Sequence, residues 1–100
     1  MMQLEANDYQ IVRNEVINGV RYVTAYPSQQ VCSIQIDIEI IDRTIQKVAY
    51  TGGCNGNTQG LGALLKGMSV DDAISKLKGI SCGGKATSCP DQLARVLEEI

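Results

Sequence analysis

Residues 31–41 have the sequence Val-Cys-Ser-Ile-Gln-Ile-Asp-Ile-Glu-Ile-Ile. Apolar and polar side chains alternate through this stretch, which is the period-two pattern of a β-strand with one buried and one solvated face. The members of the apolar set are Cys32, Ile34, Ile36, Ile38 and Ile40. We therefore expect a strand over residues 31–41 whose apolar face, with Cys32 in it, lies against the core.

The chain before this strand predicts a β-hairpin. Two runs rich in β-branched and aromatic residues, at positions 11–17 and 20–26, flank Asn18-Gly19. Asn-Gly accepts the positive φ angles of a tight two-residue turn and is the strongest short hairpin signal. A helix over residues 3–12 is the alternative for the start of the chain.

The chain after this strand predicts one more strand. Asp42-Arg43 is expected to form a short turn, and residues 45–51 follow with Val48 and Tyr50 on one side. Together with the hairpin, these segments predict an antiparallel sheet of three to four strands with one solvated face.

The second half of the chain changes to a helical period. Asn57 is a suitable N-cap for a helix over residues 58–66, and Gly67 is a suitable residue to end it. Ser69 with Asp72 resembles a capping box that opens a helix over residues 70–78.

The last predicted helix begins at Cys89-Pro90, with Cys89 as the N-cap and Pro90 at the first helical position. Its buried stripe is expected to consist of Leu93, Val96, Leu97 and Ile100. Strands followed by helices predict an α+β domain of two layers, with three helices packed on one face of the sheet.

Composition narrows the classes of function. The chain has 100 residues, 44% of them hydrophobic, and a formal net charge of −2, which fits one domain and argues against nucleic-acid binding. No apolar stretch approaches the roughly 20 residues of a membrane-spanning helix. The first fifteen positions lack the apolar segment of a secretory signal, so we expect a cytoplasmic protein.

The four cysteines, Cys32, Cys54, Cys82 and Cys89, are the residues most suited to chemistry. In a reducing cytoplasm they indicate metal or redox chemistry more than disulfides, and the absence of histidine leaves thiolates and carboxylates as ligands. Cys54 and Cys82 lie beside glycine pairs, and Cys89 lies where a helix begins and favours an anion. Their spacing includes no Cys-x-x-Cys pair. Three hypotheses therefore stay open: a shared metal or cluster site, redox-active thiols, and buried cysteines that only fill space.

Three motifs point to a known family. They are Thr-Ser-Cys-Pro-Asp at 87–91, Tyr-Thr-Gly-Gly-Cys-Asn-Gly-Asn at 50–57, and Leu-Lys-Gly-Ile-Ser-Cys-Gly-Gly-Lys at 77–85. The chain closely resembles the TSCPD-domain family over residues 22–100, with residues 1–21 as an N-terminal extension. That family is related to the C-terminal domain of adenosylcobalamin-dependent ribonucleotide reductases. The resemblance implies that Cys32, Cys54, Cys82 and Cys89 are the family's four cysteines and form one site.

The resemblance also implies an association with ribonucleotide reduction. A chain of this size cannot hold the barrel, nucleotide and cofactor of a reductase, so we expect an accessory module with no cobalamin site of its own. The order of elements is also similar to that of IscU/NifU-type iron–sulfur scaffold proteins. By this similarity Cys32, Cys54 and Cys89 correspond to the three ligands of the scaffold, and Cys82, which has no counterpart there, is expected to act as a fourth ligand. This implies bound zinc or an iron–sulfur cluster, with a ribonucleotide reductase or an iron–sulfur assembly protein as partner.

Overall fold

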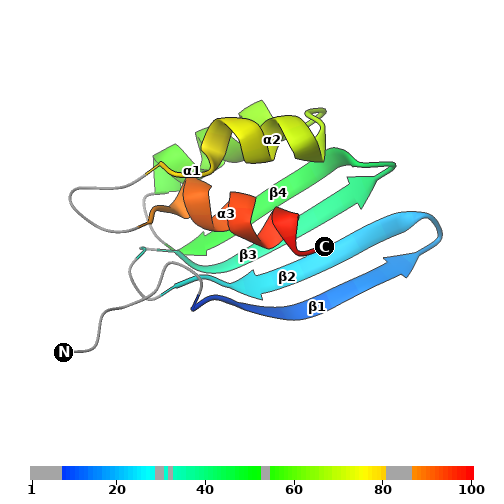
Figure 1. Cartoon of the computed structure of the whole chain (residues 1–100), viewed down its shortest axis with the longest axis horizontal. Helices are drawn as coiled ribbons and strands as arrows, with labels where there is room; N and C mark the ends of the chain where they lie inside the picture. The colour runs from blue at the N-terminus through cyan, green and yellow to red at the C-terminus, as the bar shows by residue number, and fades with distance from the viewer. Residues whose placement is uncertain (1–7, 29–30, 32, 53–54, 81–86) are drawn as a thin grey trace.

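The computed structural model describes residues 8–28, 31, 33–52, 55–80 and 87–100. Four strands form one antiparallel sheet in the order β1-β2-β3-β4, and three helices follow them in the chain. The strands are β1 (Gln10–Ile17), β2 (Val20–Tyr26), β3 (Ser33–Ile41) and β4 (Thr44–Gly52). The helices are α1 (Asn55–Leu65), α2 (Val70–Leu77) and α3 (Cys89–Glu98). The α+β prediction is thus confirmed with four strands (Figure 1).

Both predicted turns are present. Asn18 and Gly19 have φ angles of 52° and 80°, and Asp42 and Arg43 have φ angles of 48° and 62°. Two consecutive residues with positive φ form the turn whose twist matches that of paired strands. The hairpin prediction is therefore confirmed over β1, and the alternative of a helix reaching residue 12 is wrong.

A register shift in β3 changes which residues face the core. The pairing of β3 with β4 is irregular between Ser33 and Gln35. As a result Ser33 is buried at 3% exposure, whereas Ile34 is 66% exposed. The prediction that Ile34 belongs to the buried set is wrong, because strict alternation does not survive a bulge. Cys32, which the alternation assigns to the same set, lies outside the described residues.

Helix α1 begins earlier than predicted. It spans Asn55–Leu65, so Asn57 lies inside it and is not its N-cap. Helix α1 packs so closely on β4 that a Cβ atom at Gly62 would lie 2.7 Å from the carbonyl oxygen of Val48. The predicted end is close, since the helix stops at Leu65 and Gly67 has a φ of 88°.

The capping predictions for the other two helices have different outcomes. Ser69 caps α2 by accepting a hydrogen bond of 3.1 Å from the backbone N–H of Asp72, as expected. At α3 the N-cap is Ser88, not Cys89, because the hydroxyl of Ser88 accepts from the N–H of Asp91. Serine is a much better N-cap than cysteine since its oxygen is a strong acceptor.

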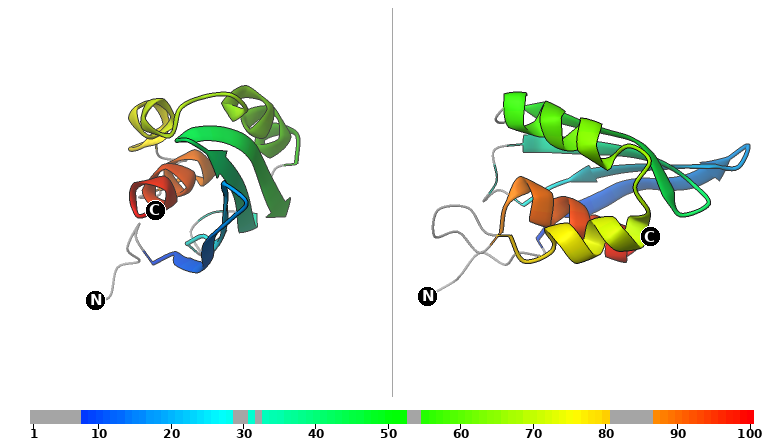
Figure 2. Two further views of the ribbon diagram at one scale, coloured as in Figure 1. Left: turned by 90° about the vertical axis from the view of Figure 1, so that its right-hand side faces the viewer. Right: turned by 90° about the horizontal axis from the view of Figure 1, so that it is seen from above.

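All three helices contribute residues to one core with the sheet. Figure 2 shows α3 in the concave side of the sheet with α2 beside it, whereas α1 packs along β4. The core between the two layers is almost wholly aliphatic. Its largest fully buried apolar members are Ile36, Ile38, Ile45, Leu65, Leu93, Leu97, Val23, Val70 and Val96. Of the stripe predicted for the last helix, Leu93, Val96 and Leu97 are buried and Ile100 is partly buried. In the described part of the chain, no helix is long and apolar enough to cross a membrane.

Candidate functional site

Cys89 is the first residue of α3. This end of α3 lies at the end of the sheet where β3 begins and β4 ends (Figure 1). The side chain of Cys89 is partly exposed and forms no disulfide. The Sγ atom lies 3.2 Å from the Oγ atom of Ser33 on β3. A hydroxyl at this distance can donate a hydrogen bond to the sulfur, so Ser33 is positioned to stabilise it as an anion.

The backbone of Cys89 is held by the neighbouring strand, β4. The hydroxyl of Tyr50, on β4, donates a hydrogen bond of 3.2 Å to the carbonyl oxygen of Cys89. Burial raises the pKa of Tyr50, and the nearby sulfur of Cys89 raises it further through its charge. The phenol therefore stays protonated and remains a donor. Two strands thus fix the N-terminal end of α3: β3 contacts the sulfur of Cys89, and β4 binds its carbonyl oxygen.

The bulge in β3 is what turns Ser33 toward Cys89. In a regular strand with Ile36 and Ile38 in the core, residue 33 would lie on the solvated face. The register shift between Ser33 and Gln35 reverses this and buries Ser33. Bulges often redirect a side chain beside a functional site, and here the redirected side chain is the one that meets the sulfur.

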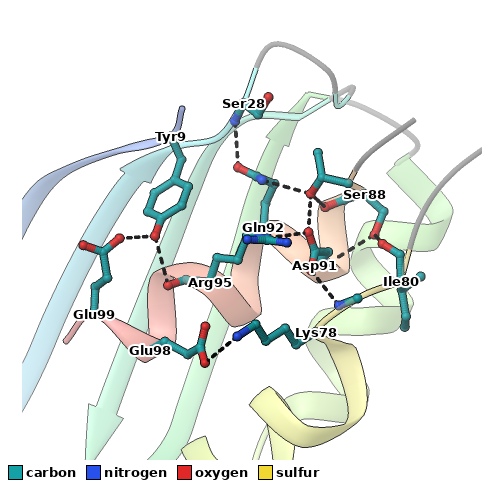
Figure 3. Close-up of polar contacts among 12 residues, drawn as sticks. Tyr9, Ser28, Lys78, Ile80, Ser88, Asp91, Gln92, Arg95, Glu98 and Glu99 are labelled. Atoms are coloured by element: carbon teal, nitrogen blue, oxygen red, sulfur yellow. Dashed lines mark hydrogen bonds and ion pairs between the residues drawn. The ribbon is translucent and has the colours of Figure 1, made fainter. Parts of the chain in front are cut away.

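Asp91 is the centre of a buried polar network that holds the Thr-Ser-Cys-Pro-Asp segment (Figure 3). Its carboxylate accepts hydrogen bonds from the hydroxyl of Thr87, from the backbone N–H of Gly79 at 2.7 Å and from Nε of Arg95 at 2.8 Å. Burial alone would raise the pKa of Asp91, but these three donors outweigh burial and lower it. The carboxylate is therefore ionised and fully partnered, which suits a structural role.

Two further side chains extend this network to neighbouring segments. The hydroxyl of Ser88 donates to the carbonyl oxygen of Ile80 at 2.6 Å. Gln92 donates to the hydroxyl of Thr87 at 2.9 Å, and its Oε1 accepts from the backbone N–H of Ser28 at 2.8 Å. The start of α3 is thereby joined to the segment after α2 and to the segment after β2.

Among the four predicted ligands, the structure describes Cys89 alone; Cys32, Cys54 and Cys82 lie outside the described residues. Within the described part, no group of three or more Cys, His, Asp or Glu side chains could hold a metal ion. Near neighbours of the other cysteines lie at Cys89 or at residues that contact or adjoin it. Ser33 contacts its sulfur, Gly52 pairs with Ser33 in the sheet, and Ile80 contacts the adjacent Ser88.

Sequence reasoning missed Gln92 and the role of Asp91. The prediction for the last helix treated only its apolar stripe as buried, yet Asp91 and Gln92 are both 0% exposed. A helix only ten residues long with polar residues at its start gives no periodic sign of this burial. The available signal was chemical: Thr87, Asp91 and Arg95 are spaced four residues apart and can hydrogen-bond in sequence.

A surface hollow of about 550 Å³ opens beside the site. Its lining comes from the start of β1 and the residue range before it, from the end of β2 and the segment after it, and from the start of β3. It consists of Asp8, Gln10, Tyr26, Pro27, Ser28, Val31, Ser33 and Ile34. Ser33 therefore connects this open surface with the sulfur of Cys89.

The TSCPD domain model matches residues 9–100. The chain belongs to the TSCPD-domain family. The five residues for which the domain is named, Thr87 to Asp91, form the capped and hydrogen-bonded start of α3. The TSCPD match includes β1 and β2 as well as the cysteine-bearing segments. No curated protein and no solved structure gave a match, so the similarity to iron–sulfur scaffold proteins stays a prediction.

Proposed function

We propose that this TSCPD domain is a four-cysteine binding module in which Cys32, Cys54, Cys82 and Cys89 together hold zinc or an iron–sulfur species. The observation that carries the proposal is the meeting of chain segments at Cys89. The hydroxyl oxygen of Ser33, the residue that directly follows Cys32, lies 3.2 Å from the sulfur of Cys89.

Covalent geometry supports the proposal for the remaining cysteines. Consecutive Cα atoms lie about 3.8 Å apart, and two residues span about 7 Å at most. Cys32 is one residue from Ser33, Cys54 is two residues from Gly52, and Cys82 is two residues from Ile80. Ser33 contacts Cys89, Gly52 pairs with Ser33, and Ile80 contacts Ser88. Four sulfurs tethered so near one point can approach the roughly 4 Å separation of a tetrahedral thiolate site.

The chemistry of the donors fits such a group. Four thiolates are a common ligand set for structural zinc and for iron–sulfur clusters. Cys89 lies in the first turn of α3, where the helix dipole favours negative charge. The hydroxyl of Ser33 can donate to its sulfur, and such outer hydrogen bonds orient and tune metal ligands. Bound zinc would cross-link the segments, whereas a cluster would also allow electron transfer.

The family relationship suggests the cellular setting. We propose that the module serves ribonucleotide reduction or iron–sulfur handling in the cytoplasm, as a partner of a larger enzyme and not as a reductase by itself.

The direct test is elemental analysis of protein purified anaerobically, followed by cobalt(II) substitution. We expect about one zinc ion or one cluster per chain, and sulfur-to-cobalt charge-transfer bands typical of tetrahedral thiolate ligation. Cys89→Ser should weaken metal binding at least about tenfold, whereas Ser75→Ala, an exposed change on α2, should not. A folded, metal-free protein that gives no cobalt bands would contradict the proposal.

A second candidate function is thiol–disulfide exchange between Cys82 and Cys89. The hydrogen bond between Ser88 and Ile80 favours it, because it joins the neighbours of those two cysteines. Titration of the thiols against a defined redox buffer should then show reversible oxidation of Cys82 with Cys89. If neither metal binding nor reversible oxidation occurs and Cys→Ser changes affect only stability, the cysteines are packing residues.

A further inference from the structure

The outer edge of β1 is open. In the described part of the chain, β1 pairs only with β2, and three of its apolar side chains are exposed: Val12 at 48%, Val16 at 56% and Ile17 at 44%. The opposite edge is different, because the start of β4 is covered by the segment between α1 and α2. Ile45 donates to the carbonyl of Met68 at 2.8 Å and accepts from the N–H of Gly67 at 2.7 Å. An open edge with apolar side chains is a template for another strand.

The sequence of this edge is symmetric about its centre. Residues 12–16 are Val-Arg-Asn-Glu-Val, with a valine at each end and opposite charges on either side of Asn14. Arg13 and Glu15 lie on the same face, since their side chains form an ion pair, and Arg13 also stacks on Tyr22 with 5.0 Å between the guanidinium carbon and the ring centre. An antiparallel partner with this same sequence would meet complementary groups at every position.

We propose that β1 pairs antiparallel with β1 of a second copy of this chain, about a two-fold axis at Asn14. Arg13 then lies opposite the partner's Glu15, and Glu15 lies opposite the partner's Arg13. Outward of these pairs, Val16 of each copy lies next to the partner's Val12, the residue at the bulge of β1. Directly opposed residues on antiparallel strands are the contacts that stabilise or destabilise a sheet, according to their charges.

Charge selects this register over its neighbours. A two-fold axis at Arg13 would put Arg13 opposite the partner's Arg13, and an axis at Glu15 would put two glutamates together. An axis at Val16 would leave Arg13 beyond the paired segment. The bulge of β1 lies between Ile11 and Arg13, so the regular part of the strand, from Arg13 to Ile17, includes the central pairs.

The resulting dimer has one continuous sheet. A two-fold axis perpendicular to the sheet keeps both helical layers on the same face, so two four-stranded sheets become one of eight strands. The exposed valines of each copy are then covered by the other. This dimer uses no cysteine and is independent of metal binding.

The test is sedimentation equilibrium of the full chain with a set of charge variants. The wild type should form a concentration-dependent dimer of the 10.8 kDa chain. Glu15→Arg gives four arginines at the centre of the interface and Arg13→Glu gives four glutamates, so each should raise the dimer Kd about tenfold or more. The double swap R13E/E15R should restore dimerisation.

The decisive arm is an equimolar mixture of the two single variants, R13E and E15R. The first has two glutamates beside Asn14 and the second has two arginines there. Each glutamate of one copy then faces an arginine of the other, so the heterodimer should form with a lower Kd than either variant's own dimer.

The control is Lys76→Glu, an exposed change on α2 with the same effect on net charge as Arg13→Glu, and this variant should dimerise as the wild type does. Circular dichroism of each variant confirms folding. A monomeric wild type at several hundred micromolar, or a dimer that neither single variant weakens, would overturn the proposal.

Discussion

The Sγ atom of Cys89 and the Oγ atom of Ser33 lie 3.2 Å apart, although 56 positions separate the two residues in the chain. The contact joins the first turn of a helix to a bulge at the start of a strand. It makes Ser33 the described side chain best placed to act on the sulfur without being a ligand itself.

We expect Ser33→Ala to weaken metal binding while leaving the fold intact. Removing a hydrogen bond to a metal ligand typically lowers affinity about 10- to 100-fold. Competition with a chromophoric chelator under anaerobic conditions measures this, and Ser33→Thr, which keeps the hydroxyl, should recover part of the loss. Equal affinities for the wild type and Ser33→Ala would show that the hydroxyl only fills space.

Asp91 should make the protein sensitive to acid. Its pKa in the folded protein is lower than the ordinary value of 3.8, so its stabilising contribution is complete above that pH and is lost as the pH falls through the folded value. Asp91→Asn should therefore cost about 1–3 kcal/mol at pH 7 and flatten the loss of stability below about pH 4. Urea unfolding between pH 2.5 and 7 tests both parts. Ser75→Ala, an exposed change on α2, is the control and should show the acid profile of the wild type.

Two glycines of α1 should respond to alanine in opposite directions. A Cβ atom at Gly62 would lie 2.7 Å from the carbonyl oxygen of Val48, whereas one at Gly60 would meet nothing within 4 Å. Gly62→Ala should destabilise the protein by about 1–3 kcal/mol through overpacking against the backbone of β4. Gly60→Ala should stabilise it by about 0.5–1 kcal/mol through helix propensity. Thermal unfolding of the pair decides the matter, and equal shifts would show that α1 does not pack on β4 as described.

Tyr9 should make the protein sensitive to alkali. Its hydroxyl donates to Glu99 and to the carbonyl of Arg95, and burial together with Glu99 raises the pKa of Tyr9 to about 12. A raised phenol pKa means that the folded state holds its proton more tightly, so the contribution is complete below pH 10 and is lost as the pH rises toward 12. Tyr9→Phe should cost about 1 kcal/mol at pH 7 and show a shallower decline between pH 10 and 12. Tyr22→Phe should decline as the wild type does.

Local rules predict most of the fold. Asn18-Gly19 and Ser69 with Asp72 each specify their structure through a few adjacent residues, and both are found where expected. The failures depend on contacts between distant segments. Whether Ser33 or Ile34 faces the core, for example, depends on a bulge in the pairing with β4.

The candidate site was predictable in part. Cys89 could be recognised as a residue at the start of a helix, but the partner of its sulfur could not, because Ser33 lies on a face that alternation assigns to solvent. Asp91 was visible as a charge in the first turn of that helix. Its burial could not be foreseen, since the donors that compensate it include the backbone of Gly79 and the distal Arg95.

The polar network around Asp91 also explains why four of the five residues of the family motif, Thr87 to Asp91, are needed for folding. Ser88 caps the helix, Pro90 occupies its first turn, and Thr87 and Asp91 lock the preceding backbone. A homologue could keep these four residues, exchange the sulfur for a methyl or hydroxyl group, and still fold this corner in the same way. Four-fifths of the signature thus records architecture, and genome surveys that infer chemistry from it should score the central cysteine separately.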